Sequence, residues 1–593
     1  MKKLLLIAMV LTGLSAKAQY FHHTYGSSWG NEFLRSGVNT VLQGQGHFIA
    51  GHHRLTCLQP LSVIPTAFTD VDGTIPGAPY FARNFILSRP NGAALHAMGA
   101  QAFELDDASG FGLIGMYIDF SITSGSNTGI FYIQLDPNGD PLNVYEYTVG
   151  NTNYRVSTVE GIAETTFSGS NDVYITGSVS DNSSTYPYAM KIDYTNGSIV
   201  WSSVYDILTS VSHNELSRAV CESPYTPFGT AEIVVVGTVV DYAGSNTPDG
   251  FLMHVDAGNG SLLAPVNLYG TNSSQDEFSS IRVSSNTTAG SAGFIIGGYT
   301  DLPGDMDFWV VNTDDAGNVN FSTAFNYTPN GGYNQCHDVI ERFNTWSNYE
   351  YYAVGYAQNG IFGGSDIMVV KIDDGGNGIS EFTYGGPNGD IGLMLDQNNG
   401  NAGANPDGLS VYGRWGGTVA GAPETDMYIV KAYFSGHSGC NEKTHSTTQT
   451  SSPGLLSTVS ASTLLSFNSG TLAISYLSLG NTNLCYNLTL PGSNARVAPD
   501  GNEEEKAGVL LIPNPAESGI TDVEIVVESE EPGEADVTIY DMAGRQVYKG
   551  RFVMARGANS LKLDISKSHL TPGMYTVQVN GAVSDQTILL QVN

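Results

Sequence analysis

A repeat of about sixty residues runs through most of this chain and constrains its fold more than any other feature. Short apolar runs that end in glycine recur at residues 47–51, 111–115, 173–177, 233–237, 294–298, 351–355 and 409–413. The terminal glycines of successive runs are 64, 62, 60, 61, 57 and 58 residues apart. A period of this length indicates one supersecondary unit copied along the chain.

Each unit of the repeat predicts four short strands. A second apolar run follows the glycine and usually ends in an acid, at residues 129–136, 188–193, 250–256, 307–314, 366–373 and 426–431. A turn that contains glycine comes next, and a third strand leads toward a Tyr-Gly pair such as Tyr269-Gly270. A fourth segment, which often begins with an acid and an apolar residue, closes the unit. The inner runs are apolar at consecutive positions, which is typical of strands covered on both faces.

Seven such units predict an all-β fold, with a seven-bladed β-propeller over residues 19–434. Radial packing covers both faces of every blade and leaves only short sheet edges. A sandwich array or an open solenoid is the alternative. Residues 20–26 match the third strand of a unit but have no preceding partners, so we expect this N-terminal strand to complete the last blade.

The segments outside the repeat predict an exported protein. Lys2 and Lys3, the apolar residues 4–14 and the small-x-small residues 16–18 are typical of a signal peptide over residues 1–18. No other segment approaches the length of a transmembrane span. The period is lost over residues 435–490, which we expect to form an irregular β extension or cap, and residues 491–507 have the composition of a linker.

Charge restricts the partners that this chain can have. Acidic residues outnumber basic residues by 57 to 24, which gives a formal net charge of -33. This charge repels a phosphate backbone, so nucleic acid is not an expected partner. It also permits weak capture of divalent cations.

The last segment, residues 508–593, predicts a small Ig-like β-sandwich from six short strands. Three landmarks follow one another in it, at residues 512–515, 537–547 and 570–575. They resemble the type IX secretion sorting domain (type A) of cargo proteins of the Bacteroidota. The resemblance rests on Pro513, Asn514, Pro515, Gly544, Arg545, Pro572, Gly573 and Tyr575. It implies recognition by the type IX secretion machinery, and secretion or display at the outer cell surface after passage through the periplasm.

Five cysteines occur in the chain, so not all of them can pair within one molecule. Cys440 and Cys485 flank one irregular segment and are the candidate disulfide. The alternative is that all five are small buried apolar side chains.

Two groups of residues are candidate metal ligands. Asp301, Asp305 and Asp307 lie in one loop and could supply oxygen ligands to calcium, although turn chemistry explains these acids equally well. Histidines concentrate near the N-terminus, and two or three of them could converge on a metal or simply form hydrogen bonds. These are His22, His23, His47, His52 and His53.

The repeat region carries no recognisable catalytic motif, because a nucleophile elbow, a phosphate loop and an HExxH helix are all absent from the sequence. Glu32, Glu215 and Glu277 occupy equivalent positions in their units, which favours a structural role over a catalytic one. We therefore expect a non-catalytic binding or adhesion module for an extracellular glycan or protein, with no cofactor other than the candidate calcium ion. The alternatives are an extracellular polysaccharide-degrading enzyme and a structural component of the cell surface or of the secretion apparatus.

Overall fold

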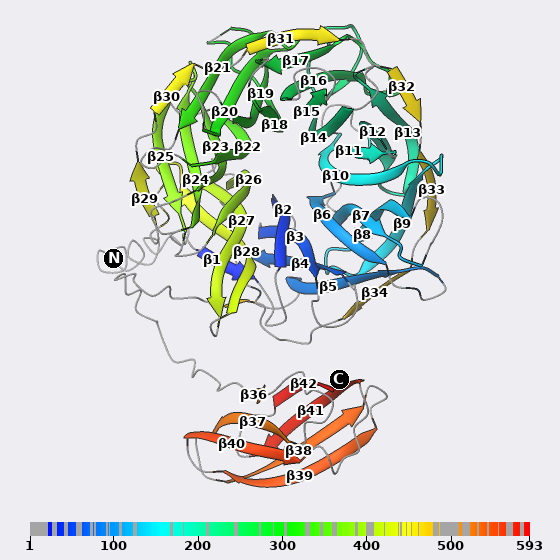
Figure 1. The fold of residues 1–593 in the computed structure, drawn as a ribbon, viewed down its shortest axis with the longest axis vertical. Coiled ribbons are helices and arrows are strands. Elements are labelled where there is room, and N and C mark those ends of the chain that lie inside the picture. Colours follow the sequence, from blue (N-terminus) through cyan, green and yellow to red (C-terminus); the bar gives the residue numbers. More distant parts are fainter. Residues whose placement is uncertain are drawn as a thin grey trace, which may run out of the picture. The chain divides into compact units, whose positions relative to one another are not determined.

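The structure is a computed structural model, and it describes residues 22–486 and 509–592 apart from short segments. The longest of these segments are residues 26–31, 55–61, 399–407, 478–484, 513–521 and 565–572. The chain divides into two compact units, Met1–Ala495 and Arg496–Asn593, and each is described by itself. Every regular element in the described residues is a β-strand (Figure 1). The expected all-β fold is confirmed.

Within the described residues, the first unit contains seven groups of four antiparallel strands. The first group is β2 (Glu32–Thr40), β3 (Gly46–Arg54), β4 (Ser62–Asp70) and β5 (Phe81–Ser88). The second group is β6 (His96–Glu104), β7 (Phe111–Ile118), β8 (Thr128–Leu135) and β9 (Pro141–Val149). The third group is β10 (Arg155–Glu164), β11 (Asp172–Ser180), β12 (Thr185–Asp193) and β13 (Ser198–Asp206). The next two are β14 (His213–Ser223), β15 (Glu232–Asp241), β16 (Pro248–Asp256) and β17 (Val266–Gly270), then β18 (Asp276–Ser284), β19 (Gly293–Thr300), β20 (Asp307–Asp314) and β21 (Val319–Asn326). The last two are β22 (Asn334–Phe343), β23 (Tyr349–Gln358), β24 (Ser365–Asp373) and β25 (Gly378–Tyr384), then β26 (Ile391–Asn398), β27 (Gly408–Val419), β28 (Ala422–Tyr433) and β1 (His22–Tyr25).

The grouping differs in phase from the sequence repeat. The segments expected to close the units instead begin the next group: β14 pairs along its length with β15, which holds the following glycine-ended run. A single parallel bridge, Thr185↔Asn214, links β12 to β14 and joins the third and fourth groups into one ten-stranded sheet. In the seventh group, β1 from the N-terminus pairs with β28, from His22↔Val430 to Tyr25↔Met427.

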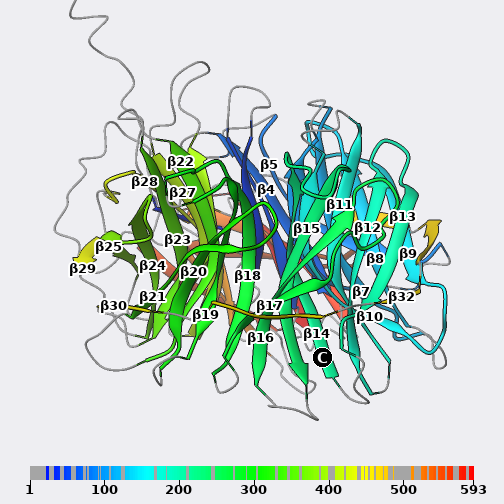
Figure 2. The same cartoon turned by 90° about the horizontal axis from the view of Figure 1, so that it is seen from above.

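The groups follow one another around a ring, with the first strand of each group toward the centre (Figure 1). Seen from the side, the strands of these groups run roughly along the axis of the ring (Figure 2). Apolar side chains fill the space between neighbouring groups. Phe48, for example, stacks on Phe111 of the next group with the ring centroids 4.2 Å apart. One cluster joins the first group to the seventh, with Leu34 of β2 packed among residues that include Ile429 of β28. Because each group is covered on both sides, a middle strand such as β8 is buried at every position.

Seven short strands from residues 442–486 form a strap around the outside of the ring (Figure 1). Each strap strand pairs antiparallel with the outermost strand of one group, so every group gains a fifth strand. The strap strands pair with the groups in reverse chain order, from the sixth group to the first and then with the seventh. The pairs are β29 (Glu442–His445) with β25, β30 (Thr448–Ser451) with β21, β31 (Gly454–Val459) with β17, β32 (Ser462–Leu465) with β13, β33 (Phe467–Thr471) with β9, β34 (Ala473–Leu477) with β5 and β35 (Cys485–Tyr486) with β1. The strap thereby satisfies edge strands that would otherwise present unpaired backbone groups.

The recurring acids and tyrosines of the repeat have structural roles at the turns. Asp373, at the end of β24, accepts hydrogen bonds from the backbone amides of Gly375 (3.0 Å) and Asn377 (2.7 Å). Gly376 in the same turn has a φ of 86°, which favours glycine. A tyrosine of the preceding group donates a hydrogen bond to the carbonyl oxygen of such a turn glycine, as Tyr147 does to Gly197 (3.0 Å). Equivalent bonds from Tyr205 to Gly260, from Tyr269 to Gly317 and from Tyr384 to Gly436 link three further pairs of successive groups.

The second unit has a three-stranded sheet and a four-stranded sheet in its described residues. The strand orders are β36 (Val509–Ile512), β37 (Asp522–Ser529) and β40 (Gly557–Asp564), and β39 (Gln546–Met554), β38 (Gly533–Asp541), β41 (Gly573–Gly581) and β42 (Gln586–Val592). Val537, Ile539 and Val577 of the larger sheet are fully buried, so this unit has an apolar core of its own.

Candidate ligand-binding channel

Each of the seven innermost strands carries a β-bulge at an equivalent point. The pairing register shifts between Leu34 and Ser36, Met98 and Gln101, Val159 and Gly161, Ser217 and Ala219, Phe278 and Ser280, Cys336 and Asp338, and Gly392 and Met394. Six of the residues skipped by these shifts line one cavity at the centre of the ring, namely Arg35, Glu160, Arg218, Ser279, His337 and Leu393. A bulge redirects a side chain out of the sheet, and in these six strands it presents the skipped side chain to the channel.

The bulges explain the glycine that defines the repeat. On Gly355, a β-carbon would lie 1.7 Å from the carbonyl oxygen of Gln335 in the bulged strand β22. The same contact would be 1.9 Å for Gly237 with Leu216 and for Gly298 with Glu277. No side chain fits at these distances, so the close approach of the bulged backbone requires glycine in these three copies.

Polar links join the innermost strands around the channel. Asp338 of β22 accepts hydrogen bonds from Arg282 of β18 (3.1 Å) and from the backbone amide of Leu395 of β26 (3.0 Å). Asp396 of β26 accepts one from the backbone amide of Asn39 of β2 (2.9 Å). The channel wall is therefore a connected polar network that crosses the boundaries between groups.

One cavity in the channel, of about 350 Å³, collects basic side chains. Arg282 pairs with Asp338, and Arg218 lies 3.5 Å from Glu160 and 3.8 Å from Glu277. Two further arginines, Arg35 and Arg414, also line this cavity.

The two further arginines act on each other and on a histidine. Burial lowers the pKa of Arg414, and the positive charge of Arg35 lowers it further. Burial and the charges of Arg414, Arg218 and Arg35 lower the pKa of His337 to about 4. These shifts mark a concentration of positive charge that a bound anion would stabilise.

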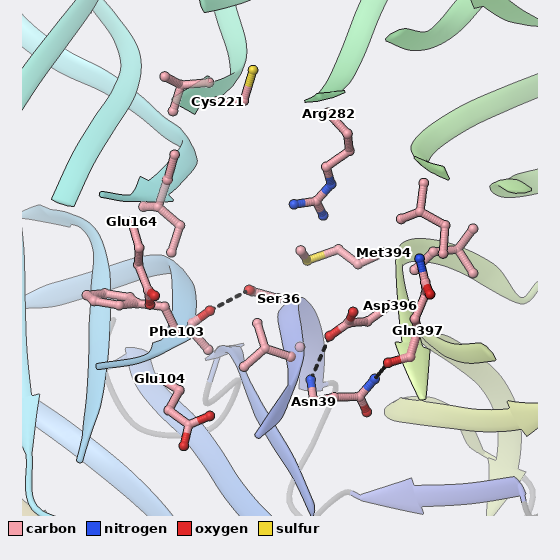
Figure 3. Close-up of a pocket in the computed structure, with 18 of the residues that line it drawn as sticks. Ser36, Asn39, Phe103, Glu104, Glu164, Cys221, Arg282, Met394, Asp396 and Gln397 are labelled. Atoms are coloured by element: carbon pink, nitrogen blue, oxygen red, sulfur yellow. Dashed lines mark hydrogen bonds between the residues drawn. The ribbon is translucent and has the colours of Figure 1, made fainter. Parts of the chain in front are cut away.

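A second cavity, of about 780 Å³, collects acids further along the same strands. Every innermost strand contributes earlier residues to the basic cavity and later residues to this one, so the seven strands run in the same direction along the channel. Arg282 points into the acidic cavity, where Glu104, Glu164 and Asp396 also project (Figure 3). Burial raises the pKa of Asp396 to about 6 and also raises the pKa of Glu341. The smaller cavity thus holds arginines together with Glu160, Glu277 and Asp338, whereas acids predominate in the larger cavity, where Arg282 is the basic lining residue.

The three candidate calcium ligands differ in their exposure to solvent. Asp307 is fully buried, Asp305 is exposed, and Asp301 accepts a 2.7 Å hydrogen bond from the backbone amide of Gln275. Burial and the charge of Asp305 raise the pKa of Asp307 to about 7. Among the described residues, the one group of three His, Cys, Asp or Glu side chains with ligand atoms within 4.8 Å of one another is Asp206, His213 and Glu215. Calcium binding by Asp301, Asp305 and Asp307 stays a prediction.

The N-terminal histidines do not belong to that group either. His47 is buried, and its Nδ1 lies 3.1 Å from the hydroxyl of Tyr412 in the seventh group. His22 and His23 lie in β1, whose pairing with β28 completes the seventh group. His47 therefore contributes to contact between the first and last groups.

The cysteine prediction stays open. Cys221 and Cys336 are buried free thiols, and burial raises the pKa of both. Cys485 lies in the strap opposite Tyr25, whereas Cys440 lies outside the described residues. The pairing of Cys440 with Cys485 is therefore still a prediction.

Several sorting-motif residues also lie outside the described residues, namely Pro513, Asn514, Pro515, Gly544 and Pro572. Of the others, Arg545 is exposed, Gly573 begins β41, and Tyr575 is buried in β41. Residues 510–592 match the family model "Secretion system C-terminal sorting domain". This match supports export of the chain as type IX secretion cargo, to the cell surface or the extracellular space.

Other comparisons add little. No curated protein matches the sequence. Among solved structures, "Crystal structure of dimeric latent PorU from Porphyromonas gingivalis" is similar at 11% identity and a TM-score of 0.13, over 78% of this chain and 35% of that chain. The chain thus spans about a third of the length of that protein. At this TM-score, neither fold nor function can be inferred from the likeness. Within the described residues, no helix has the length and apolar character needed to cross a membrane.

The channel residues were missed by sequence reasoning. Arg35 and Arg218 each lie three positions after a glutamate that recurs in the repeat, Glu32 and Glu215. Aligning the units on these glutamates would have placed Arg35 and Arg218 at one equivalent position of the repeat. Such a position on a repeated scaffold is a signal for ligand contact.

Proposed function

We propose that this protein is a secreted type IX cargo whose first unit is a seven-bladed β-propeller, and that the propeller binds an extracellular ligand without transforming it. The succession of groups around the ring, the apolar cluster between the first and seventh groups, and the pairing of β1 with β28 support the propeller assignment. The two sheets and separate core of the second unit support an Ig-like sandwich that serves as the export tag.

The ligand class that we propose is an acidic glycan, bound at the basic cavity of the channel. The observation that carries this proposal is the convergence of Arg35, Arg218 and Arg414 on one cavity in a chain of net charge -33. Arginine binds carboxylate and sulfate groups through a planar set of donors. These contacts would have to offset the repulsion between an acidic glycan and the net negative charge of the chain. Tyr299 and Tyr356 add aromatic surface near these arginines: Tyr299 lines the cavity, and Tyr356 stacks on His337 with ring centroids 5.8 Å apart.

Cleavage of a polysaccharide is the second candidate function, and the acidic cavity favours it. Raised pKa values of carboxyl groups, as for Asp396 and Glu341, are typical of general acids in glycosidases. Both groups also accept hydrogen bonds from a neighbouring innermost strand or the loop that follows it, Asp396 from Asn39 and Glu341 from Ser285 (2.8 Å). These contacts give both carboxylates a structural role, so we place binding ahead of cleavage.

A binding assay with matched variants tests the proposal. The mature chain, residues 19–593, is titrated against polygalacturonate, chondroitin sulfate and neutral dextran, with release of reducing ends measured in parallel. We expect binding to at least one acidic polymer, weaker binding at high salt, and no release of reducing ends. The double variant Arg35→Met/Arg414→Met should lose at least tenfold in affinity, whereas the control Lys549→Met/Arg551→Met, with the same change of charge in the second unit, should not. Equal binding of both variants, or binding to dextran alone, would contradict the proposal, and release of reducing ends would favour the enzyme.

A further inference from the structure

Three potential metal ligands converge where β13 leads into β14. Asp206 is the last residue of β13, and His213 and Glu215 lie at the start of β14. The Nε2 atom of His213 is 3.5 Å from Oδ1 of Asp206 and 3.6 Å from Oε1 of Glu215. One ligand atom from each side chain lies within 4.8 Å of both others. This cluster lies outside the channel cavities and plays no part in the proposed glycan binding.

The positions of these side chains are set by their surroundings. The carboxylate of Glu215 accepts hydrogen bonds from the backbone amides of Ile207 (2.9 Å) and Leu208 (2.6 Å). The ring of Tyr186 packs edge-on against His213, with the centroids 5.2 Å apart and the planes at 83°. A preformed donor set of this kind reduces the entropy lost when an ion binds.

The spacing of the donor atoms suits a small divalent ion. Two ligands at about 2.1 Å from a tetrahedral zinc ion lie about 3.4 Å apart, close to the separations from His213 to the two carboxylates. Imidazole with two carboxylates is a donor set that divalent transition metals bind. The fourth position would remain for water, since the side chain of Asp206 is 23% exposed while those of His213 and Glu215 are nearly inaccessible.

The electrostatics of the cluster favour a cation. The side chain of Glu215 is fully buried and that of Asp206 is 23% exposed, and a carboxylate oxygen of each lies within 3.6 Å of Nε2 of His213. Two carboxylates held close together in a buried place are costly to ionise unless positive charge offsets them. A divalent ion would supply two positive charges.

We propose that Asp206, His213 and Glu215 bind one divalent transition-metal ion, with zinc as the expected occupant. The ion would connect the last strand of the third group to the first strand of the fourth. That junction also contains the Thr185↔Asn214 bridge, which joins these two groups into one sheet. Neither channel cavity is lined by these three residues, so we expect the ion to stabilise the junction between the two groups and not to contact a ligand in the channel.

The test uses the mature chain, residues 19–593, stripped with a chelator and then titrated with zinc or cobalt. We expect one zinc per chain after dialysis, a higher apparent unfolding temperature with zinc than with chelator, and the visible absorption of tetrahedral cobalt. Asp206→Asn, which keeps the shape of a partly exposed side chain, should lower zinc affinity at least tenfold and remove the cobalt absorption. Asp181→Asn, a nearby change that leaves the three ligands intact, should have neither effect.

Two results would overturn the proposal. The first is wild-type protein that holds no zinc above background and shows no change in unfolding temperature, which would leave a His213 ion pair as the role of the cluster. The second is zinc bound equally by wild type and Asp206→Asn, which would place the ion on other histidines. Far-ultraviolet circular dichroism of Asp206→Asn confirms that any loss of zinc reflects the ligand and not unfolding.

Discussion

The backbone amide of Asn39 donates a 2.9 Å hydrogen bond to Oδ2 of Asp396, although the two residues are 357 positions apart in the chain. Asn39 belongs to the first innermost strand of the ring and Asp396 to the last. The side chain of Asn39 adds a 2.8 Å hydrogen bond to the carbonyl oxygen of Gln397. The two ends of the repeat thus meet at the channel wall, next to the acidic cavity (Figure 3).

Alanine in place of a repeat glycine should destabilise the ring. In Gly355→Ala the new β-carbon would overlap the carbonyl oxygen of Gln335, and we expect a loss of at least about 2 kcal/mol. Gly389→Ala is the matched control, because a β-carbon there meets nothing within 4 Å. Urea unfolding followed by tryptophan fluorescence measures the difference, and equal midpoints for the two variants would refute the steric explanation of the repeat.

Removal of one channel arginine should raise the pKa of His337. Burial and the charges of Arg414, Arg218 and Arg35 together lower this pKa to about 4. The variant Arg414→Met deletes one of these charges, so titration of ¹³C-labelled histidine should show the pKa of His337 rise part of the way toward its ordinary value of about 6.5. Arg551→Met serves as the control, and His337→Gln identifies the signal. No movement in Arg414→Met would mean that burial alone sets the pKa.

The same shift gives the protein a stability that depends on pH. An unfolded chain binds a proton at histidine near pH 6.5, whereas native His337 does so only near pH 4. The contribution of His337 is therefore fully present above about pH 6.5 and is lost as the pH falls toward 4. The apparent unfolding temperature of wild type should fall more steeply over this range than that of His337→Gln. Parallel profiles for the two proteins would rule out this contribution.

The strap should stabilise the ring by covering its outer edges. Replacing residues 442–477 with a Gly-Ser linker of equal length should lower the apparent unfolding temperature by more than about 5 °C and promote self-association, because six outer strands lose their partners. The same replacement of residues 491–507, the expected linker, should change neither. Scanning calorimetry measures the unfolding temperature, and size-exclusion chromatography measures self-association. An unfolding temperature and an elution volume that both stay unchanged after strap replacement would contradict the prediction.

Export should depend on the second unit. A chain that lacks residues 508–593 should accumulate in the periplasm, since the match to the sorting domain lies within those residues. Fractionation of cells that express the truncated and full chains measures this, with Arg545→Ala as a test of the exposed motif residue in the intact module. Normal secretion of the truncated chain would exclude the sorting role.

The sequence by itself determined the all-β class, the number of units and the kind of strand that each unit contains. These features depend on local chemistry repeated in every copy: glycine where a bulge presses on its neighbour, aspartate where a turn must be capped, and apolar runs where both faces are covered. Repetition made the signal visible because the same steric demand recurs at Gly237, Gly298 and Gly355.

Only the tertiary structure decided what lies in the channel, where the strap runs and which groups meet at Asp206, His213 and Glu215. Arg35, Arg218 and Arg414 come from different groups, and the ring alone brings them to one cavity. The strap pairs through backbone hydrogen bonds with the outer edges of the groups. Backbone pairing does not require particular side chains, so the sixty-residue sequence repeat does not extend into the strap. Contacts between distant segments depend on the geometry of packing, and local sequence pattern does not encode that geometry.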